Sequence, residues 1–172
     1  IGITMGDAAG IGPEIVVQAY VQGLGAPAVV YGDAGALRRA ATLLGADIKV
    51  LERQDVSQAS FPAASLEVIA CSPALPEDLP PGKISAAAGR AAYDFVQAAI
   101  DDALAGKIRA IVTAPLNKES MHQAGITYPG HTEILADRTH TDEFAMMLAN
   151  ETLRVLLVTI HIPLARVVAK IT

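Results

Sequence analysis

The sequence predicts an α/β fold with a largely parallel or mixed sheet, and three observations support this class. Hydrophobic residues make up 52% of the 172 residues, whereas aromatic residues make up only 4% and tryptophan is absent. A core built from Ala, Val, Ile and Leu is typical of helices that cover a buried parallel sheet. Short apolar runs also alternate with Ala-rich periodic segments, as strands alternate with helices in this class. The length suits about one domain with a sizeable core.

The N-terminal part begins with a strand, a glycine-rich turn and a helix. Residues 1–4 are apolar, glycines punctuate residues 6–12, and Pro13 suits the first turn of the helix that follows. A second helix is predicted at residues 34–45 and ends at Gly45. The other strands expected here are short apolar runs: 26–33, 47–51 and 65–71.

A proline-rich connection at residues 72–83 leads into the second part of the chain. Residues 85–106 then predict an Ala-rich helix with Ser85 as its N-cap. Residues 108–115 predict a buried strand, and residues 116–126 a short helix with its turn.

The C-terminal part contains one further helix and a long apolar run. The helix is predicted at residues 131–140, whereas residues 143–150 fit either a helix or a strand. Residues 153–164 predict a strand that runs into a Pro-terminated loop, followed by the start of a helix. Because the chain begins within a strand and stops within a helix, we expect it to be a fragment of a longer protein.

Composition excludes several classes of partner and site. The formal net charge of -5 argues against a nucleic-acid partner, because phosphate binding needs a clustered basic face. The apolar runs are too short to cross a bilayer, and the first residues lack the charged start of a signal peptide, so we expect a soluble cytoplasmic protein. Cys71 is the only cysteine, which excludes an internal disulfide and a thiolate metal cluster. Its place after an apolar run favours a small residue at a strand end over a nucleophile.

Polar residues follow several predicted strands, where ligands gather in open α/β sheets. Asp7 follows the first strand, and Asn117 and Lys118 follow the strand at residues 108–115. The glycine-rich turn beside Asp7 offers backbone N–H groups to an anion. It lacks the dinucleotide-binding fingerprint, however, and a tight strand-to-helix connection explains its glycines at least as well.

Lys118 and His161 each have a structural and a functional interpretation. Lys118 is either an exposed residue in the first turn of a helix or a contact for an anion or substrate, since a cation is poorly placed there relative to the helix dipole. His161 closes an apolar strand, where a lone histidine is more often a hydrogen-bonded core residue than a metal ligand. The sequence supplies no obvious second and third ligand. His122 and His140 are expected to be helical and exposed.

His131 and Thr132 stand at the predicted start of a helix, directly after Pro129 and Gly130. Thr132 fits a simple N-cap, an interpretation that competes with substrate binding. His131 is harder to explain structurally, because a loop histidine beside a hydroxyl presents two hydrogen-bonding groups to a polar ligand.

The chain resembles the N-terminal half of the 4-hydroxythreonine-4-phosphate dehydrogenase family in the order and separation of five motifs: GDAAGIGPE, TAPLNKESMHQAGI, YPGHTEILADRT, FAMML and LRVLLVTIHIPL. The resemblance covers essentially the whole chain. It implies a three-layer α/β/α fold like that of the isocitrate and isopropylmalate dehydrogenases, with two interwoven domains. Residues 1–125 then correspond to the first domain and residues 126–172 to the beginning of the second, which is incomplete here.

The resemblance also implies an activity. Family members oxidise 4-phosphohydroxy-L-threonine with NAD (or NADP) and a divalent metal (Zn, Mg or Co), and decarboxylation gives 3-amino-2-oxopropyl phosphate for vitamin B6 biosynthesis. His131 and Thr132 match the family's substrate-binding pair, and His161 matches the first of three metal-binding histidines. The remaining ligands lie in the family's C-terminal half, so this chain alone is expected to be inactive. The family further implies a homodimer with the active site at the subunit interface.

Two alternatives remain open. A paralogous enzyme of the same superfamily oxidises 4-phospho-D-threonate or 4-phospho-D-erythronate in sugar-acid catabolism and shares these motifs. A non-catalytic ligand-binding module that keeps the scaffold is a different class of function, although a fold alone does not need His131, Thr132 and His161.

Overall fold

The computed structural model describes residues 1–160 and 162–171. Contacts within the chain divide it into two compact units, Ile1–Thr139 and His140–Thr172. The first unit holds the main sheet and its helices, and the second holds a small hairpin. The predicted division near residue 125 refers to the domains of the family's longer chain and stays a prediction.

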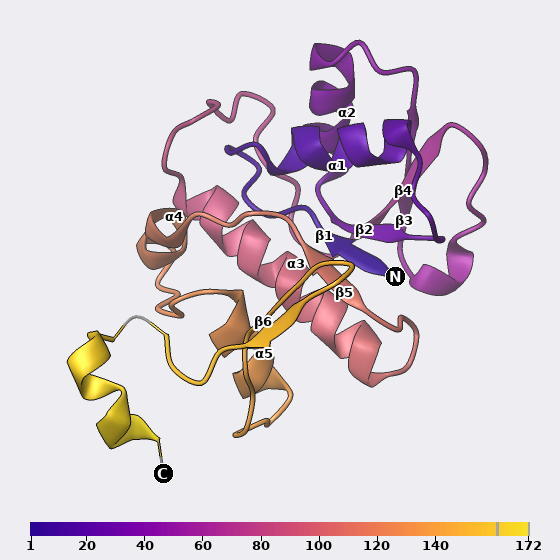
Figure 1. The fold of residues 1–172 in the computed structure, drawn as a ribbon. Helices are drawn as coiled ribbons and strands as arrows, with labels where there is room; N and C mark the ends of the chain where they lie inside the picture. Colours follow the sequence, from indigo (N-terminus) through magenta and orange to yellow (C-terminus); the bar gives the residue numbers. More distant parts are fainter. Residues whose placement is uncertain (161, 172) are drawn as a thin grey trace. The chain divides into compact units, whose positions relative to one another are not determined.

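The first unit is built on a five-stranded parallel sheet (Figure 1). Its strands are short and mostly apolar: β1 (Gly2–Thr4), β2 (Val29–Gly32), β3 (Lys49–Arg53), β4 (Ser65–Ala70) and β5 (Ile111–Thr113). They lie in the order β3-β4-β2-β1-β5, and every pairing in this sheet is parallel. The predicted α/β class is therefore confirmed, with a parallel rather than a mixed main sheet.

Helices cover both faces of this sheet. The chain passes from β1 through α1 (Gly12–Gln22) to β2, and from β2 through α2 (Ala34–Leu43) to β3, in one direction across the sheet. It then returns through β4 and α3 (Ala86–Leu104) in the opposite direction to β5. Because such crossovers are right-handed, this reversal places α3 on the face opposite α1 and α2 (Figure 1).

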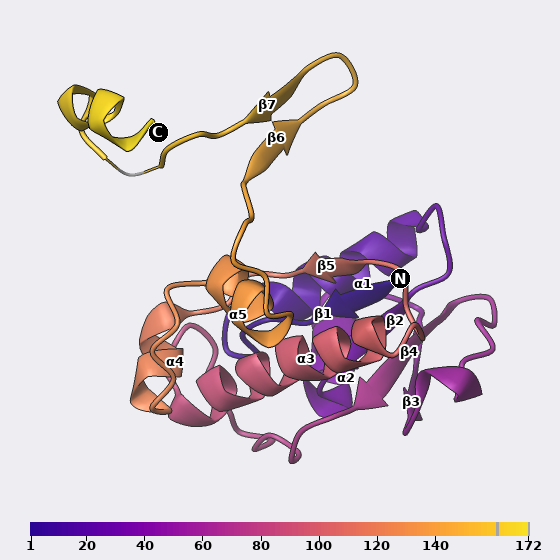
Figure 2. The ribbon, with the colours of Figure 1, turned by 90° about the horizontal axis from the view of Figure 1, so that it is seen from below.

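Two shorter helices, α4 (Lys118–Gln123) and α5 (His131–Arg138), pack against α3 (Figure 2). They share an apolar cluster with α3, separate from the main core. The buried members of this cluster are Val96, Ile100, Met121, Ile126 and Ile134. The start of α5 is thus positioned by α3 and α4 rather than by the sheet directly.

Several helix boundaries follow the predicted signals. Ser85 caps α3, since its Oγ accepts a hydrogen bond of 3.3 Å from the backbone N–H of Ala88. Pro13 lies in the first turn of α1, and Gly45 follows α2 with a φ of 60°. Asp33 caps α2 through its carboxylate, a cap that the sequence analysis did not assign.

The strand predicted as buried at residues 108–115 is short and exposed instead. β5 contains only three residues, and Val112 is 49% exposed. β5 pairs with β1 and is the edge strand of the described sheet. Its apolar sequence led to the wrong prediction of burial, because burial depends on neighbours that the sequence of the strand does not specify.

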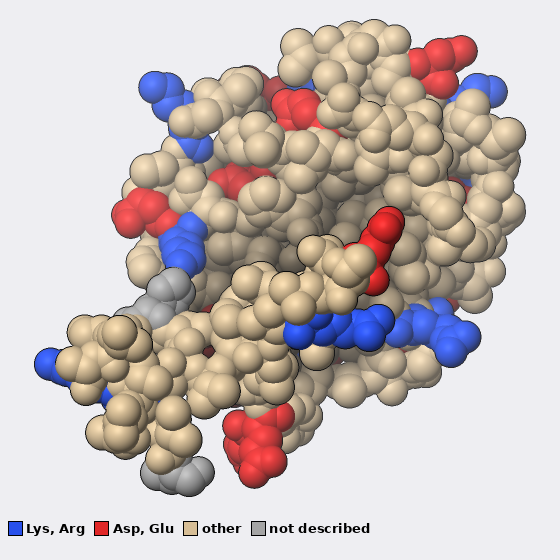
Figure 3. Space-filling model, in the orientation of Figure 1, with Lys and Arg blue, Asp and Glu red and all other residues tan. Residues whose placement is uncertain are grey.

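Acidic and basic side chains are interspersed on the face of the molecule shown in Figure 3. The formal net charge of the chain is -5. Among the described residues, no helix is both long enough and apolar enough to span a bilayer.

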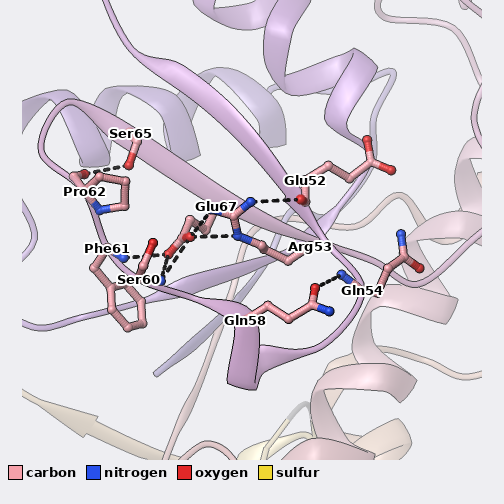
Figure 4. A network of polar contacts seen from close by, with 9 residues as sticks. All are labelled: Glu52, Arg53, Gln54, Gln58, Ser60, Phe61, Pro62, Ser65 and Glu67. Carbon is pink, nitrogen blue, oxygen red and sulfur yellow. Dashed lines mark hydrogen bonds and ion pairs between the residues drawn. The ribbon is translucent and has the colours of Figure 1, made fainter.

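A buried carboxylate, Glu67 of β4, holds the loop that precedes its own strand (Figure 4). Its side chain is 1% exposed and accepts hydrogen bonds from the backbone N–H groups of Ser60 at 2.9 Å and Phe61 at 2.8 Å. Arg53 of β3 donates through Nε at 3.0 Å. Burial opposes the charge, but these donors outweigh it and lower the pKa of Glu67. The carboxylate therefore ties the loop at residues 59–64 to two strands.

The second unit contains an antiparallel hairpin of β6 (Met147–Ala149) and β7 (Arg154–Leu156). The hairpin resolves residues 143–150 in favour of a strand, whereas the long strand predicted at residues 153–164 is wrong, since β7 has three residues. Short 3-10 turns at Leu164–Arg166 and Val168–Lys170 stand where a helix was expected. An apolar run extends as a strand only where a partner strand supplies its hydrogen bonds. In the described part of this unit, β6 pairs with only three residues of the run at 153–164.

Candidate functional site

The carboxyl ends of β1 and β5 form the reversal point of the sheet. β1 leads to α1 on one face, whereas β5 leads to α4, which packs on α3 at the other face. Open α/β sheets bind ligands outside the carboxyl ends of two neighbouring strands whose following connections go to opposite faces of the sheet. Three of the predicted site residues lie near this point: Asp7 in the loop after β1, Asn117 in the loop after β5, and Lys118 as the first residue of α4.

Asp7 is buried, and each of its carboxylate oxygens accepts a hydrogen bond within the protein. Its side chain accepts a hydrogen bond of 2.8 Å from the backbone N–H of Ala9 and one of 3.3 Å from the hydroxyl of Ser120. Its own backbone N–H donates to the carbonyl of Pro115 at 2.9 Å. Asp7 therefore joins the loop after β1 to the loop after β5, and its predicted contact with substrate stays a prediction.

The glycines of the turn after β1 are explained by close backbone approach. Gly6 has a φ of 72°, and a side chain there would overlap the carbonyl of Pro115. A side chain at Gly12 would overlap the carbonyl of Met5. The tight-connection interpretation is thus sufficient for these glycines. The turn also ends at the start of α1, which no side chain caps.

Asn117 and Lys118 stand at the start of α4 but differ in whether their side chains are hydrogen-bonded within the protein. Asn117 is the N-cap, and its Oδ1 accepts a hydrogen bond of 2.9 Å from the backbone N–H of Ser120. Lys118 is exposed and forms no hydrogen bond or ion pair with other described residues. The structure therefore gives Asn117 a capping role and leaves the Lys118 ammonium group available to a ligand.

Ser120 connects these residues, although the sequence analysis did not single it out. It is fully buried, donates to Asp7, and accepts a hydrogen bond of 3.3 Å from the backbone N–H of Ser85. A side chain at Gly89 of α3 would overlap the backbone of Ser120, so α3 and α4 cross in close contact here. The only local signal was its place three residues after the capping residue Asn117.

His131 and Thr132 begin α5, and the structure changes the interpretation of Thr132. The N-cap of α5 is Gly130, and no side chain caps this helix, so the simple N-cap interpretation of Thr132 is wrong. His131 is partly buried, and burial lowers the pKa of its imidazole. Its Nε2 atom is buried without a hydrogen-bond partner among the described residues. The start of α5 therefore contains a buried imidazole nitrogen without a hydrogen-bond partner among the described residues, and Thr132 follows it in the sequence.

The helix that begins with Lys118, α4, shares one apolar cluster with α5, the helix that begins with His131. Met121 of α4 follows Ser120 directly, and Ile134 of α5 lies one turn after His131; both are fully buried in this cluster. No hydrogen bond or ion pair of the described residues joins the loop of Asp7 to His131. The structure thus links Asp7 and Asn117 through Ser120, places Lys118 next to Asn117, and places His131 on a neighbouring helix.

The described residues do not fit a divalent metal site. Within residues 1–160 and 162–171, no three His, Cys, Asp or Glu side chains gather as they would around an ion. The predicted ligand His161 lies outside the described residues. His122 is exposed on α4 as expected, whereas exposed His140 follows α5 in a turn with a φ of 52°.

The hollow nearest the glycine-rich turn does not fit a pyrophosphate. It has a volume of about 410 Å³ and lies between α1, α2 and the loop that contains Glu77 and Asp78. Glu14, Glu77 and Asp78 line it with a single cation, Arg39, so carboxylates outnumber the guanidinium group. Outside this hollow, Cys71 is not a candidate nucleophile, because burial raises the pKa of its thiol to about 12.

Comparison with known proteins places these features in a family. The family model described as pyridoxal phosphate biosynthetic protein PdxA matches residues 25–172. D-threonate 4-phosphate dehydrogenase of Salmonella typhimurium is 46% identical over 96% of this chain and 52% of its own. 4-Hydroxythreonine-4-phosphate dehydrogenase of Trichlorobacter lovleyi is 41% identical over 100% of this chain and 52% of its own.

The fold agrees with a solved structure of a similar protein. A crystal structure titled 4-hydroxythreonine-4-phosphate dehydrogenase from Klebsiella pneumoniae is 44% identical and superimposes with a TM-score of 0.90. The match covers 96% of this chain and 51% of that one. The chain thus spans about half the length of the relatives it matches. From the family model, the relatives and the shared fold together, we conclude that this chain belongs to the PdxA family.

Proposed function

We propose that the protein carrying this chain is a dehydrogenase that oxidises a phosphorylated hydroxy acid, and that His131 and Thr132 bind this substrate. The observation that carries the proposal is the start of α5, where His131 Nε2 is buried without a partner and no side chain caps the helix. The first backbone N–H groups of any helix lack partners within the helix. They attract anionic groups, and the helix dipole adds to this attraction.

The chemistry of this helix start suits a substrate with both hydroxyl and anionic groups. A neutral imidazole can donate through one nitrogen and accept through the other, so it can bond a substrate hydroxyl in either direction. The lowered pKa of His131 favours this neutral form near neutral pH. The Glu133 carboxylate in the same turn repels an anion and offsets part of the attraction from the helix start.

Lys118 is proposed as a further contact for an anionic group of the substrate. Its ammonium group is exposed and unpaired among the described residues at the reversal point of the sheet. Asp7 and Asn117 remain candidate contacts, but their hydrogen bonds within the protein support a positioning role.

Cofactor, metal and assembly follow from the family rather than from the described residues. We propose NAD or NADP as the hydride acceptor and a divalent ion (Zn, Mg or Co), with His161 as one metal ligand. The remaining ligands must come from residues outside those described. A homodimer in the cytoplasm, interwoven domains of the isocitrate dehydrogenase type and a domain boundary near residue 125 belong to the same proposal.

Two substrates fit the family nearly equally. Relatives named for D-threonate 4-phosphate and for 4-hydroxythreonine-4-phosphate are 46% and 41% identical to this chain. We propose 4-phosphohydroxy-L-threonine, with decarboxylation to 3-amino-2-oxopropyl phosphate, as in pyridoxal phosphate biosynthesis. The alternatives are 4-phospho-D-threonate or D-erythronate in sugar-acid catabolism and, in another class, a non-catalytic ligand-binding module.

Reduction of NAD by the protein carrying this chain tests these alternatives directly. Absorbance at 340 nm is followed with divalent metal and each of the three phosphorylated acids. Preference for 4-phosphohydroxy-L-threonine supports the vitamin B6 role, and preference for either phosphorylated sugar acid moves the protein to catabolism. Saturable binding without turnover of any of them would favour the non-catalytic module.

His131→Ala tests the proposed substrate contact, with His122→Ala as the matched control on an exposed part of α4. The first variant should lose about tenfold or more in kcat/KM, while the second keeps wild-type kinetics. Normal kinetics of His131→Ala would remove the helix start from the site.

A further inference from the structure

The helix that carries His131 is too short to hold its own position. α5 spans eight residues, His131–Arg138, and isolated helices of that length are unstable in water. Its place must therefore come from contacts with the rest of the protein. Ile134 supplies one of these contacts, because it is fully buried in the apolar cluster of α3, α4 and α5.

Tyr128, three residues before His131, contacts both α3 and α5. Its ring stacks on the ring of Tyr93 in α3, with 5.8 Å between the centroids and 17° between the planes. Its hydroxyl donates a hydrogen bond of 2.5 Å to Oδ2 of Asp137 in the last turn of α5. This bond to Asp137 raises the pKa of Tyr128 to about 12, so the hydroxyl keeps its proton across the physiological range.

Only two residues, Pro129 and Gly130, separate Tyr128 from His131. Pro129 fixes its own φ and disfavours the helical region for Tyr128. Gly130 is extended, with a φ of 178° and a ψ of -168°. A constraint on Tyr128 therefore acts only two residues before the start of α5.

The opposite end of α5 is attached to the same helix. Arg138 donates from Nη2 to Oδ1 of Asp101 in α3 at 2.7 Å. The Tyr93 ring also lies 5.9 Å from the guanidinium carbon of Arg90, so the stack continues along α3. α3 thus contacts the segment before α5 through Tyr128 and the C-terminal end of α5 through Arg138. The hydrogen bond between Tyr128 and Asp137 links these two contacts.

We propose that Tyr128 is a positioning residue for His131: stacked on Tyr93 and bonded to Asp137, it fixes where the His131 imidazole meets the substrate. The inference rests on the proposed function, since it assumes that His131 contacts the substrate. It assigns no contact with the substrate to Tyr128 itself. A displacement of about 1 Å at a substrate-binding group is enough to reduce turnover strongly.

The test compares variants that lose or keep the hydrogen bond. Tyr128→Phe keeps the ring stack but loses the bond, and Asp137→Ala loses the same bond from the other side. Asp137→Asn keeps an oxygen that can accept from Tyr128. Tyr20→Phe is the matched control, because it removes a tyrosine hydroxyl that donates to the carbonyl of Ala28 at 2.7 Å, away from α5.

We expect kcat/KM to fall about tenfold in Tyr128→Phe and Asp137→Ala and to stay near wild type in Asp137→Asn and Tyr20→Phe. The assay uses the protein carrying this chain with 4-phosphohydroxy-L-threonine and with 4-phospho-D-threonate. The NMR resonances of the His131 ring should shift in the first two variants only. Urea unfolding of Tyr20→Phe shows how much a lost hydroxyl bond lowers stability without affecting the site.

Wild-type kinetics and unchanged His131 resonances in Tyr128→Phe would overturn the proposal. So would a loss of kcat/KM in Tyr20→Phe equal to that in Tyr128→Phe, because the effect would then be one of stability. If the wild-type protein turns over neither acid, the proposed function fails for these substrates, and the His131 resonances alone decide the role of Tyr128.

Discussion

The hydroxyl of Ser120 donates a hydrogen bond of 3.3 Å to Oδ2 of Asp7, across 113 positions of sequence. This bond connects the loop after the first strand to the helix that follows the last strand of the sheet. Both side chains are buried, so neither can exchange its partner for water. The reversal point of the sheet therefore depends on a pair of polar groups that satisfy each other.

Ser120→Ala should lower the free energy of unfolding by about 1–3 kcal/mol, because the Asp7 carboxylate loses a donor inside the protein. Urea unfolding followed by circular dichroism gives the value. Ser65→Ala is the control, since the Ser65 hydroxyl donates to the carbonyl of Pro62 at an exposed position. An equal loss in both variants would show that the buried pair has no special weight.

Gly89→Ala should destabilise the protein by roughly 1–3 kcal/mol, although Ala favours helices over Gly by about 1 kcal/mol. The added methyl group would overlap the backbone of Ser120 and push α4 away from α3. Gly35→Ala in α2 has only side-chain atoms nearby, at 3.1 and 3.3 Å, and should be close to neutral. A Gly89→Ala variant as stable as wild type in thermal unfolding would contradict the close crossing.

Glu67 should make stability depend on pH in the acid range. Its pKa is lowered in the folded protein, so its contribution is fully present above the unfolded value of about 4.3 and is lost as the pH falls through the lower folded value. Glu67→Gln should remove this part of the acid dependence and lower stability at neutral pH. Unfolding midpoints in urea, measured from pH 3 to pH 7, provide the comparison.

Glu52→Gln is the control for that experiment, since Glu52 is exposed and its ion pair with Arg38 is 3.8 Å long. Its pH profile should follow wild type closely, because exposed ion pairs contribute little. Parallel profiles for wild type and Glu67→Gln would mean that the loop at residues 59–64 is held by something other than the charge.

Cys71 should react slowly with thiol reagents in the folded protein. With a pKa of about 12, only on the order of one thiol in ten thousand is ionised at pH 8. Release of thionitrobenzoate should be slow in buffer and rapid in guanidinium chloride, where the pKa returns to its ordinary value. Equally rapid reaction under both conditions would show that the fold does not suppress ionisation of this half-buried thiol.

Local chemistry explains what could be predicted from the sequence. Ser85, Pro13 and Gly45 act within a few residues of their own positions, so their signals can be recognised along the chain. The alternation of apolar runs with helices likewise gave the α/β class. The PGHTE motif pointed to His131 because a loop histidine beside a hydroxyl offers two hydrogen-bonding groups and because the motif matches the family, and this substrate contact stays a prediction.

Features that depend on distant partners could not be predicted in the same way. Ser120 acquires its role from Asp7 and from the close crossing at Gly89, none of which is visible in its neighbours. The stack of Tyr93 in α3 on Tyr128, in the loop before α5, likewise depends on a partner distant in the sequence. The length of β7 depended on a partner strand, so an apolar run alone gave the wrong prediction.

The strand order has a consequence for how the protein acquires its structure during synthesis. β1 lies between β2 and β5, and Gly2 pairs with Val29 on one side and with Ile111 on the other. The first pairing is available as soon as β2 leaves the ribosome, whereas the second must wait for about eighty further residues, or roughly 4–16 seconds of translation at typical rates. For that interval one edge of the first strand is open to other chains, and contacts this distant in sequence also form slowly in free refolding.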